Sequence, residues 1–591
     1  MGFYNPNRHQ QGNRMRPENY LTVPEICRKL KPIFGKRIDV LFLRYTLSDD
    51  LNQKREIEQT INALYQKHLS ESLLVEELLL EPPEQGIVNG EYPLGKIVYA
   101  NKQLYTFGLR ESDWPRHVCI TGMSGSGKTN FAFQILFNFI KKQKPFIAFD
   151  WKKSFRPLML INEEILCFTV GTEKISNYFK LNINKPPKGV PPKEWINILC
   201  DILNESFSAS FGVHKLLSET LDRTFTEFKV YEGSENYPTW YQIKDRLNEM
   251  QNDKKFRGRE SEWLESALRI AHSLTFGAFG EALNYKGPDS LDIEKLMSKK
   301  IIFELNSLDT AEKKFFCEYM LTHIFKLKKA NYETKHNFES AILIDEAHNI
   351  LLKDKPSFMK ETVTEMIYRE IREYGVSLIC LDQHISKLSD VVAGNSACEI
   401  AFQQTLPQDV DTIANIMQMY DRKKFFSMLP VGSAVVKLVE RFHLPFIITT
   451  PLIPLREKIV TDEHVHNFMT EKMKNMKRIE IFNESVKDSE LKKKIEDLYH
   501  TFGTSGVGTT ESFLKEQLDI SNLSDISEEE NKFINAVKQN PGSGTAEIYK
   551  LLGVSARKGN ILKSQVMAKG LIKEVVEKND KGWKKILEAI K

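Results

Sequence analysis

Residues 116 to 129 read RHVCITGMSGSGKT, and within them Gly122 to Thr129 fit the pattern G-x-x-x-x-G-K-[ST]. An apolar, strand-like run precedes the pattern, and a helix-like run from Phe131 to Ile140 follows it. Between a strand and a helix, the glycines let backbone N–H groups turn inward beside the positive helix end, which forms a phosphate cradle. A Gly/Ser-rich loop can match by chance, but these flanking runs are the context that the motif requires. The stretch therefore predicts an α/β nucleotide-binding fold.

The same loop predicts how a nucleotide would be held. We expect the Lys128 ammonium to reach the β- and γ-phosphates of ATP, and the Thr129 hydroxyl to bind Mg²⁺. The expected nucleotide-binding residues are Gly122, Met123, Ser124, Gly125, Ser126, Gly127, Lys128, Thr129 and Asn130.

A second motif supplies candidates for the chemistry. Ser340 to Asn349 read SAILIDEAHN, an apolar strand that ends in two carboxylates. In such a Walker B element Asp345 would hold Mg²⁺, and Glu346 would orient and deprotonate the attacking water. The motif is weak alone, but beside a complete phosphate loop it favours ATP hydrolysis.

Two further strand ends are expected to face the same crevice, because ligands bind at the carboxyl ends of parallel strands. Gly375 to Gln383 form a buried run with a polar tip, from which Gln383 could sense the γ-phosphate. Pro145 to Asp150 form another such run. Asp150 and the following Lys152 are either secondary site residues or part of a solvated strand end.

Composition narrows the class of protein without naming a partner. A chain of 591 residues predicts three or four domains. Because 83 basic and 79 acidic residues leave a net charge of only +4, any nucleic-acid signal must come from local patches. The seven cysteines are isolated, which argues against zinc and a disulfide framework. Without a signal-like or membrane-spanning apolar run, we expect a cytoplasmic protein.

The order of patterns along the chain predicts six segments. These are a disordered polar arm (1–18), a helical N-terminal domain (19–90), a P-loop ATPase domain (91–455) with a helical insertion at about 186–300, a helical extension (456–500), a flexible linker (501–527) and a winged-helix-like domain (528–591). The ATPase domain is expected to be RecA-like, with a mainly parallel sheet. Its expected strands are residues 95–99, 103–107, 118–120, 145–150, 301–305, 340–345, 375–383, 399–403 and 433–438.

Residues from about 90 to 455 resemble the HerA/FtsK branch of P-loop ATPases, and most of all the HerA-type DNA translocases. Arg116 to Asn130 are similar to the family's R-H-x-x-I-x-G-x-[ST]-G-S-G-K-[ST]-N. Asp345 to His348, followed by Arg369 to Gly375 and then Asp382-Gln383, look like the family's Walker B element, R-E-x-R-x-x-G segment and polar strand tip. Leu429 to Gly432 are similar to the turn before the family's closing hairpin.

The resemblance implies a homohexameric ring with double-stranded DNA in its channel and ATP at each subunit interface. On that model Arg372, or else Arg369, is the arginine finger, and Arg116 is a second arginine that faces phosphate. The alternative for each arginine is a solvated helix face or a salt bridge. Archaeal HerA proteins begin with a small β-barrel, whereas residues 1–90 of this chain predict helices, so the sequence does not predict the partner surface that the barrel provides.

Three functions fit these features. The first is a motor on duplex DNA that works with a nuclease or another effector in DNA repair or anti-phage defence. The second is an ATPase of the conjugative coupling and secretion class, and the third is a non-motor ATPase scaffold that assembles an effector enzyme. The lysine-rich C-terminal unit fits sequence-independent contact with DNA phosphates and protein docking equally well.

Overall fold

The computed structural model describes residues 21–73, 79–172, 179–252, 257–287, 290–331, 337–354, 361–454 and 458–476, and several short pieces between 533 and 589. The chain divides into two compact units, residues 1–505 and 506–591. The predicted polar arm, the predicted linker and the part of the predicted helical extension beyond residue 476 lie outside the described residues.

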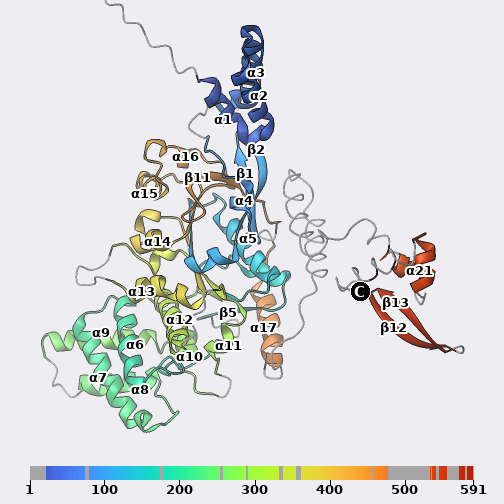
Figure 1. Cartoon of the computed structure of the whole chain (residues 1–591). Helices are drawn as coiled ribbons and strands as arrows, with labels where there is room; N and C mark the ends of the chain where they lie inside the picture. The colour runs from blue at the N-terminus through green and yellow to red at the C-terminus, as the bar shows by residue number, and fades with distance from the viewer. Residues whose placement is uncertain are drawn as a thin grey trace, which may run out of the picture. The chain divides into compact units, whose positions relative to one another are not determined.

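An eleven-stranded sheet forms the centre of the first unit, in the order β2-β1-β11-β10-β9-β3-β8-β7-β4-β6-β5 (Figure 1). Its strands are β1 Tyr92–Tyr99, β2 Lys102–Leu109, β3 Val118–Thr121, β4 Phe146–Asp150, β5 Ile165–Thr169, β6 Lys300–Glu304, β7 Ser340–Asp345, β8 Val376–Asp382, β9 Cys398–Ala401, β10 Ser433–Leu438 and β11 Phe442–Thr449. The seven strands from β9 to β5 run parallel, and β10, β11, β1 and β2 add an antiparallel edge. The predicted α/β fold with a mainly parallel sheet is confirmed.

Strand register decides which residues meet at the site. The phosphate-loop strand β3 pairs with β8, with Thr121 opposite Asp382, and β8 pairs with β7, with Leu381 opposite Asp345. On its other side β7 pairs with β4. The carboxyl ends of these four strands therefore lie side by side at one edge of the sheet, where doubly wound folds bind their ligands.

Neither β5 nor β11 is among the strands predicted from the sequence. β5 has only five residues, all buried, and so short an apolar run carries no periodicity that separates strand from helix. β11 contains Pro445, which cannot donate to a sheet ladder, and its pairing with β10 shifts register in this region, between Val436 and Leu438. The predicted strand at 433–438 is therefore only the first strand of a hairpin, and β11 is the second.

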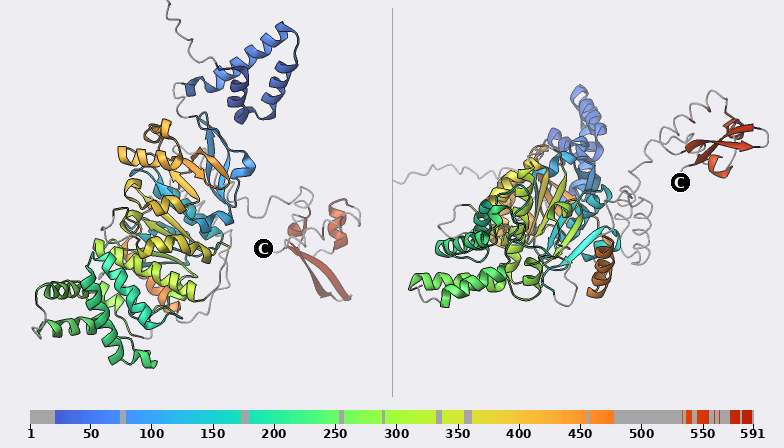
Figure 2. Two further views of the ribbon diagram at one scale, coloured as in Figure 1. Left: turned by 60° about the vertical axis from the view of Figure 1, so that its left-hand side comes forward. Right: turned by 90° about the horizontal axis from the view of Figure 1, so that it is seen from below.

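Helices cover both faces of the sheet and extend the unit at two ends (Figures 1 and 2). They are α1 Val23–Phe34, α2 Lys36–Leu47, α3 Leu51–Leu73, α4 Gln85–Val88, α5 Lys128–Lys141, α6 Pro192–Ser206, α7 Phe211–Glu227, α8 Trp240–Asn252, α9 Arg259–Ser273, α10 Gly277–Leu283, α11 Ile293–Leu296, α12 Thr310–Ala330, α13 Val363–Glu370, α14 Asp390–Asn395, α15 Pro407–Met417, α16 Phe425–Met428 and α17 Asp462–Met476. Helices α6 to α11 are inserted between β5 and β6. Within the described part of the chain, no helix is both long and apolar enough to cross a membrane.

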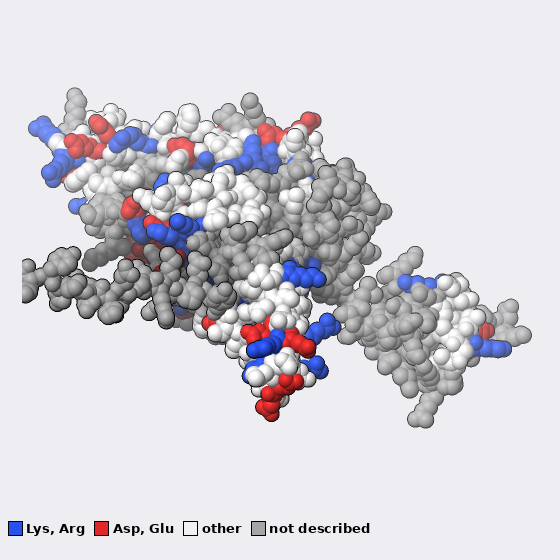
Figure 3. All heavy atoms as spheres, turned by 90° about the horizontal axis from the view of Figure 1, so that it is seen from above, with Lys and Arg blue, Asp and Glu red and all other residues white. Residues whose placement is uncertain are grey.

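Helices α1 to α3 form a small core of their own beside the antiparallel edge. The Thr22 and Glu25 side chains cap the start of α1, and Leu30, Ile61 and Leu69 are fully buried among the three helices. Tyr99 at the end of β1 joins this core and donates a 2.8 Å hydrogen bond to the carbonyl of residue 29. Basic and acidic side chains are intermixed on the face of these helices seen in Figure 3, so that face gives no electrostatic argument for nucleic-acid binding.

The second unit is described in pieces. In this unit the sequence predicts three short helices, at residues 531–538, 545–552 and 557–569, and a hairpin of residues 571–576 with 583–587. Helix α21 Thr545–Leu551 lies within the second predicted helix, and β12 Ile572–Asn579 pairs antiparallel with β13 Gly582–Ala589, with Asn579 opposite Gly582. The predicted hairpin is therefore present. Most of the other two predicted helices lies outside the described residues, and the winged-helix assignment stays a prediction.

Candidate functional site

The phosphate loop leaves the end of β3 and is held by backbone hydrogen bonds from three directions. The Gly122 N–H donates to the carbonyl of Asp382 at the end of β8 (3.2 Å), and the Met123 N–H donates to the carbonyl of Gln403 after β9 (2.7 Å). The Gly432 N–H, in the turn before β10, donates to the Ser126 carbonyl (2.9 Å). Segments far apart in sequence thus fix the loop before any ligand binds.

Two glycines of the loop are required by geometry. Gly125 has a φ of 81°, in the left-handed region that favours glycine. A Cβ on Gly122 would lie 2.6 Å from Cβ of Phe402, closer than real Cβ atoms approach. The loop can therefore take its cradle shape only with glycine at these positions.

Lys128, the first residue of α5, lies inside the cradle. Its side chain is buried, and the ammonium donates to the carbonyls of Gly122 and Met123, the latter at 2.8 Å. Burial lowers the pKa of Lys128 to about 8, against the opposing effect of the Glu346 and Asp345 carboxylates. The ammonium therefore lies inside the phosphate cradle, where an anionic ligand would stabilise its charged form.

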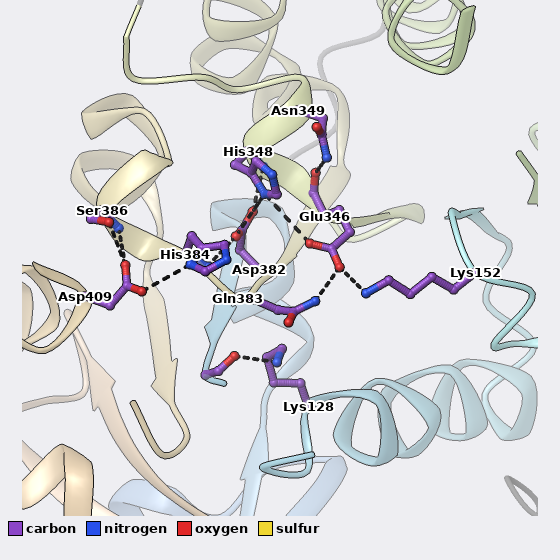
Figure 4. A network of polar contacts seen from close by, with 11 residues as sticks. Lys128, Lys152, Glu346, His348, Asn349, Asp382, Gln383, His384, Ser386 and Asp409 are labelled. Atoms are coloured by element: carbon purple, nitrogen blue, oxygen red, sulfur yellow. Dashed lines mark hydrogen bonds and ion pairs between the residues drawn. The ribbon is translucent and has the colours of Figure 1, made fainter. Parts of the chain in front are cut away.

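Glu346 follows β7 in a conformation that is rare for its residue type. Its φ and ψ are 51° and 49°, a left-handed geometry that costs about 1–3 kcal/mol for a residue other than glycine. Asn349 supports the turn by donating from its side chain to the Glu346 carbonyl (3.0 Å). The Lys152 ammonium and the Gln383 amide both donate to Oε1 of Glu346 (Figure 4). Burial opposes ionisation of this carboxyl, but these two partners keep its pKa below the usual value.

Asp345 lies beside two other carboxylates. Burial, with the charges of Asp150 and Glu346 nearby, raises the pKa of Asp345 to about 7. A hard divalent cation with oxygen ligands would relieve this concentration of negative charge. The residues present therefore fit Mg²⁺, which the Asp345 carboxylate and the half-buried Thr129 hydroxyl on α5 would hold.

The polar network continues from Glu346 through His348, whose Nδ1 lies 3.8 Å from Oε2 of Glu346, to Asp382 (Figure 4). The buried Asp382 carboxylate accepts the backbone N–H groups of His348 (2.6 Å) and His384 (2.7 Å) and also faces Nδ1 of His348 (3.0 Å). Nδ1 of His384 in turn lies 3.3 Å from the Asp409 carboxylate on α15. Burial disfavours the charged imidazole of His348, but Asp382 and Glu346 outweigh it and raise the pKa of His348.

No role is predicted from the sequence for these histidines or for Asp409. For His348 and Asp382 the sequence does hold a clue. His348 is two residues after Glu346, and Asp382 directly precedes Gln383. Asp409 reaches the network only through the fold.

The three predicted arginines lie near the amino ends of the parallel strands, whereas the phosphate loop lies at their carboxyl ends. Arg372 is exposed in the turn that precedes β8. Arg369 lies in the last turn of α13 and pairs with Glu361 (2.6 Å). Arg116 precedes β3 and pairs with Glu440. Because β8 has seven residues, its amino end is about 20 Å from the phosphate loop. The structure therefore does not bring these arginines to the phosphate loop of their own chain.

Asn130 and Asp150 also make contacts within the fold. The buried Asn130 side chain donates to the Pro451 carbonyl and accepts from the Ile453 N–H, both at 2.7 Å, so it ties α5 to the segment after β11. The Asp150 carboxylate accepts the N–H groups of Lys152 (2.9 Å) and Phe155 (2.8 Å). Of the two residues considered after β4, only Lys152 reaches a predicted catalytic residue.

His117 links β3 to the arginine-bearing segment. It is fully buried, its Nδ1 accepts the Leu378 N–H (3.0 Å), and its Nε2 lies 2.7 Å from the Tyr368 carbonyl, to which it donates. Burial lowers the pKa of His117 to about 4. The unfolded chain, with a pKa of about 6.5, binds this proton more tightly, so stability falls as the pH drops from about 6.5 toward 4.

We expect His117→Gln to flatten this acid sensitivity. Between pH 7.5 and pH 5 the wild type should lose about 2 kcal/mol more unfolding free energy than the variant, measured by urea denaturation. An equal loss in both proteins would show that His117 does not carry the effect.

The phosphate loop on β3, the Walker B carboxylates on β7 and the polar tip of the intervening β8 define a P-loop ATPase. Residues 92–395, slightly more than half of the chain, match the family model described as "Helicase HerA, central domain". The chain belongs to this family of HerA-like P-loop ATPases.

Two curated relatives carry the name DNA double-strand break repair helicase HerA. The protein from Sulfolobus acidocaldarius is 23% identical over 358 residues, and that from Sulfurisphaera tokodaii is 22% identical over 360 residues. In both cases the match covers 59% of this chain and 66% of the relative, just under two thirds of the relative's length.

Among solved structures, the chain is similar to VirB4 of Thermoanaerobacter pseudethanolicus, with a TM-score of 0.47 and 14% identity over 62% of this chain and 97% of that one. It is also similar to the bacterial conjugative coupling protein TrwB, with a TM-score of 0.45 and 10% identity over 61% of this chain and 88% of that one.

Proposed function

We propose that this chain is the ATP-hydrolysing subunit of a homohexameric ring that moves along double-stranded DNA in the cytoplasm. One observation carries the hydrolytic part: the Lys128 cradle and the Glu346 carboxylate stand at the ends of β3 and β7, on either side of β8. A nucleotide in the cradle would have a base beside its terminal phosphate.

Each group then has a task in hydrolysis of ATP. The loop N–H groups and Lys128 would bind the phosphates and compensate their charge, and Thr129 and Asp345 would hold Mg²⁺, which when bound would neutralise charge that develops on the phosphates. Glu346 accepts the proton of the attacking water. Gln383 contacts Glu346 and lies where it can respond to the γ-phosphate.

The positions of the three predicted arginines support the proposed ring. Arg116, Arg369 and Arg372 lie at the sheet edge opposite their own phosphate loop, and Arg372 is exposed. In a ring of like subunits, that edge of one subunit would face the nucleotide of the next and could supply an arginine to the transferred phosphate. Six subunits are proposed from the resemblance to HerA-type ATPases.

DNA is proposed as the track because the curated relatives are named as DNA repair helicases. We further propose that a nuclease or another effector protein uses the movement, in DNA repair or anti-phage defence. The N-terminal helices and the C-terminal unit lie outside the residues that match the family model and are the proposed places for docking such a partner.

Displacement of a third strand tests movement directly. The full-length protein is incubated with ATP and a duplex that carries a triplex-forming oligonucleotide, and release of that oligonucleotide is followed with time. We expect ATP-dependent release by the wild type and none by Lys128→Ala. ATP hydrolysis without release would favour the scaffold function over the motor.

A further inference from the structure

Glu346 is held from both neighbouring strands. It follows β7, and its Oε1 accepts hydrogen bonds from Lys152, which follows β4, and from Gln383, which follows β8 (Figure 4). Since the strand order is β8-β7-β4, the two donors approach this carboxylate from opposite sides. Gln383 is predicted from the sequence as a phosphate sensor. Lys152 is not part of the motifs that resemble the family, and they give it no role.

The turn after β4 is built to present Lys152. The Asp150 carboxylate at the strand end is fully buried and accepts the backbone N–H of Lys152 at 2.9 Å. Its second oxygen accepts the N–H of Phe155 at 2.8 Å, which closes the turn. The neighbouring Lys153 points elsewhere and pairs with Asp462 at the start of α17 (3.2 Å).

Burial makes the Lys152 contact important for Glu346. The Glu346 side chain is 11% exposed, and such a carboxylate needs hydrogen-bonding partners to stay ionised and ordered. Asp345 lies near it and adds like charge, and an oxygen of the Asp382 carboxylate lies within 4.8 Å of one of Glu346. The Lys152 side chain is 54% exposed, so its own charge costs little to maintain.

We propose that Lys152 is a positioning residue that orients the Glu346 carboxylate for attack of water on ATP. The inference rests on the proposed hydrolysis of ATP and adds a residue to it. Lys152 acts through Glu346 and does not bind the nucleotide. Without it, Oε1 would keep the Gln383 amide as its donor and Oε2 would keep Nδ1 of His348 at 3.8 Å, and the less tightly held carboxylate would sample orientations unsuited to accepting the proton.

The test compares three variants of the full-length protein in steady-state ATPase and nucleotide-binding assays. We expect Lys152→Ala to lower kcat about 10–100-fold, the range for a misplaced catalytic group, with KM and ATP affinity unchanged. Lys152→Arg should retain most of the activity because it keeps a cationic donor. Lys153→Ala is the matched control and should behave as the wild type, since Lys153 contacts Asp462 and not Glu346.

The same substitution made in a Glu346→Gln variant distinguishes a role of Lys152 in positioning Glu346 from a role in binding phosphate. In Glu346→Gln, the further change Lys152→Ala should leave the residual kcat and the ATP affinity unaltered, because the carboxylate it serves is already gone. Weaker ATP binding on loss of Lys152 in both backgrounds would overturn the proposal and make Lys152 a phosphate ligand. Wild-type kcat in Lys152→Ala would overturn it while leaving the proposed function intact, whereas a wild type without ATPase activity would overturn both.

Discussion

Glu346→Gln is expected to bind ATP and keep it, whereas Lys128→Ala is expected to lose ATP binding. The first change removes only the base that accepts the water proton, so kcat should fall about 10²–10⁴-fold with affinity nearly intact. The second removes the ammonium that lies within the cradle, 2.8 Å from the Met123 carbonyl. Binding of a fluorescent ATP analogue, together with single-turnover hydrolysis, measures both effects.

Equal loss of ATP binding in the two variants would contradict this assignment, because Glu346 would then be needed for the shape of the loop. The left-handed backbone of Glu346 does not confound the comparison, since glutamine has the same branching as glutamate and places the same strain on the turn.

Arg372→Ala is expected to cut turnover by about 10³–10⁵-fold while ATP affinity stays close to that of the wild type. The reason is its place: Arg372 lies before β8, at the sheet edge opposite the loop of its own chain, so its charge would serve the nucleotide of a neighbour. Arg369→Ala is the matched comparison, since Arg369 already pairs with Glu361.

Mixing distinguishes a shared site from a structural role. In a mixed ring of Arg372→Ala and Lys128→Ala subunits, some interfaces would join an intact Lys128 to an intact Arg372, and activity should return. Absence of activity at every mixing ratio would contradict a site shared between subunits.

The site residues that could be predicted from the sequence are those that lie close together in the chain. The glycines, Lys128 and Thr129 form one loop, and the Asp345-Glu346 pair ends one apolar strand, so each required only its own flanking residues. The strands that carry them were predicted within a few residues for the same reason.

The features that could not be predicted from the sequence are those that depend on the order of the strands in the sheet. Nothing in the run around Pro445 separates a bulged edge strand from a loop, and β11 was missed. Lys152 and Gln383 are more than 200 residues apart, and only the order β8-β7-β4 brings both to Glu346. The same topology moves the predicted arginines away from the loop of their own chain. Asn130, which reads as part of the loop motif, is occupied by the backbone after β11.

The most direct measurement for the central claim is the steady-state rate of ATP hydrolysis by the full-length protein, with and without duplex DNA, against Lys128→Ala as the blank. We expect Mg²⁺-dependent turnover that rises when duplex DNA is added and is absent from Lys128→Ala. A rate unaffected by duplex DNA would contradict a DNA motor, and a rate equal to that of Lys128→Ala would contradict ATP hydrolysis at this site.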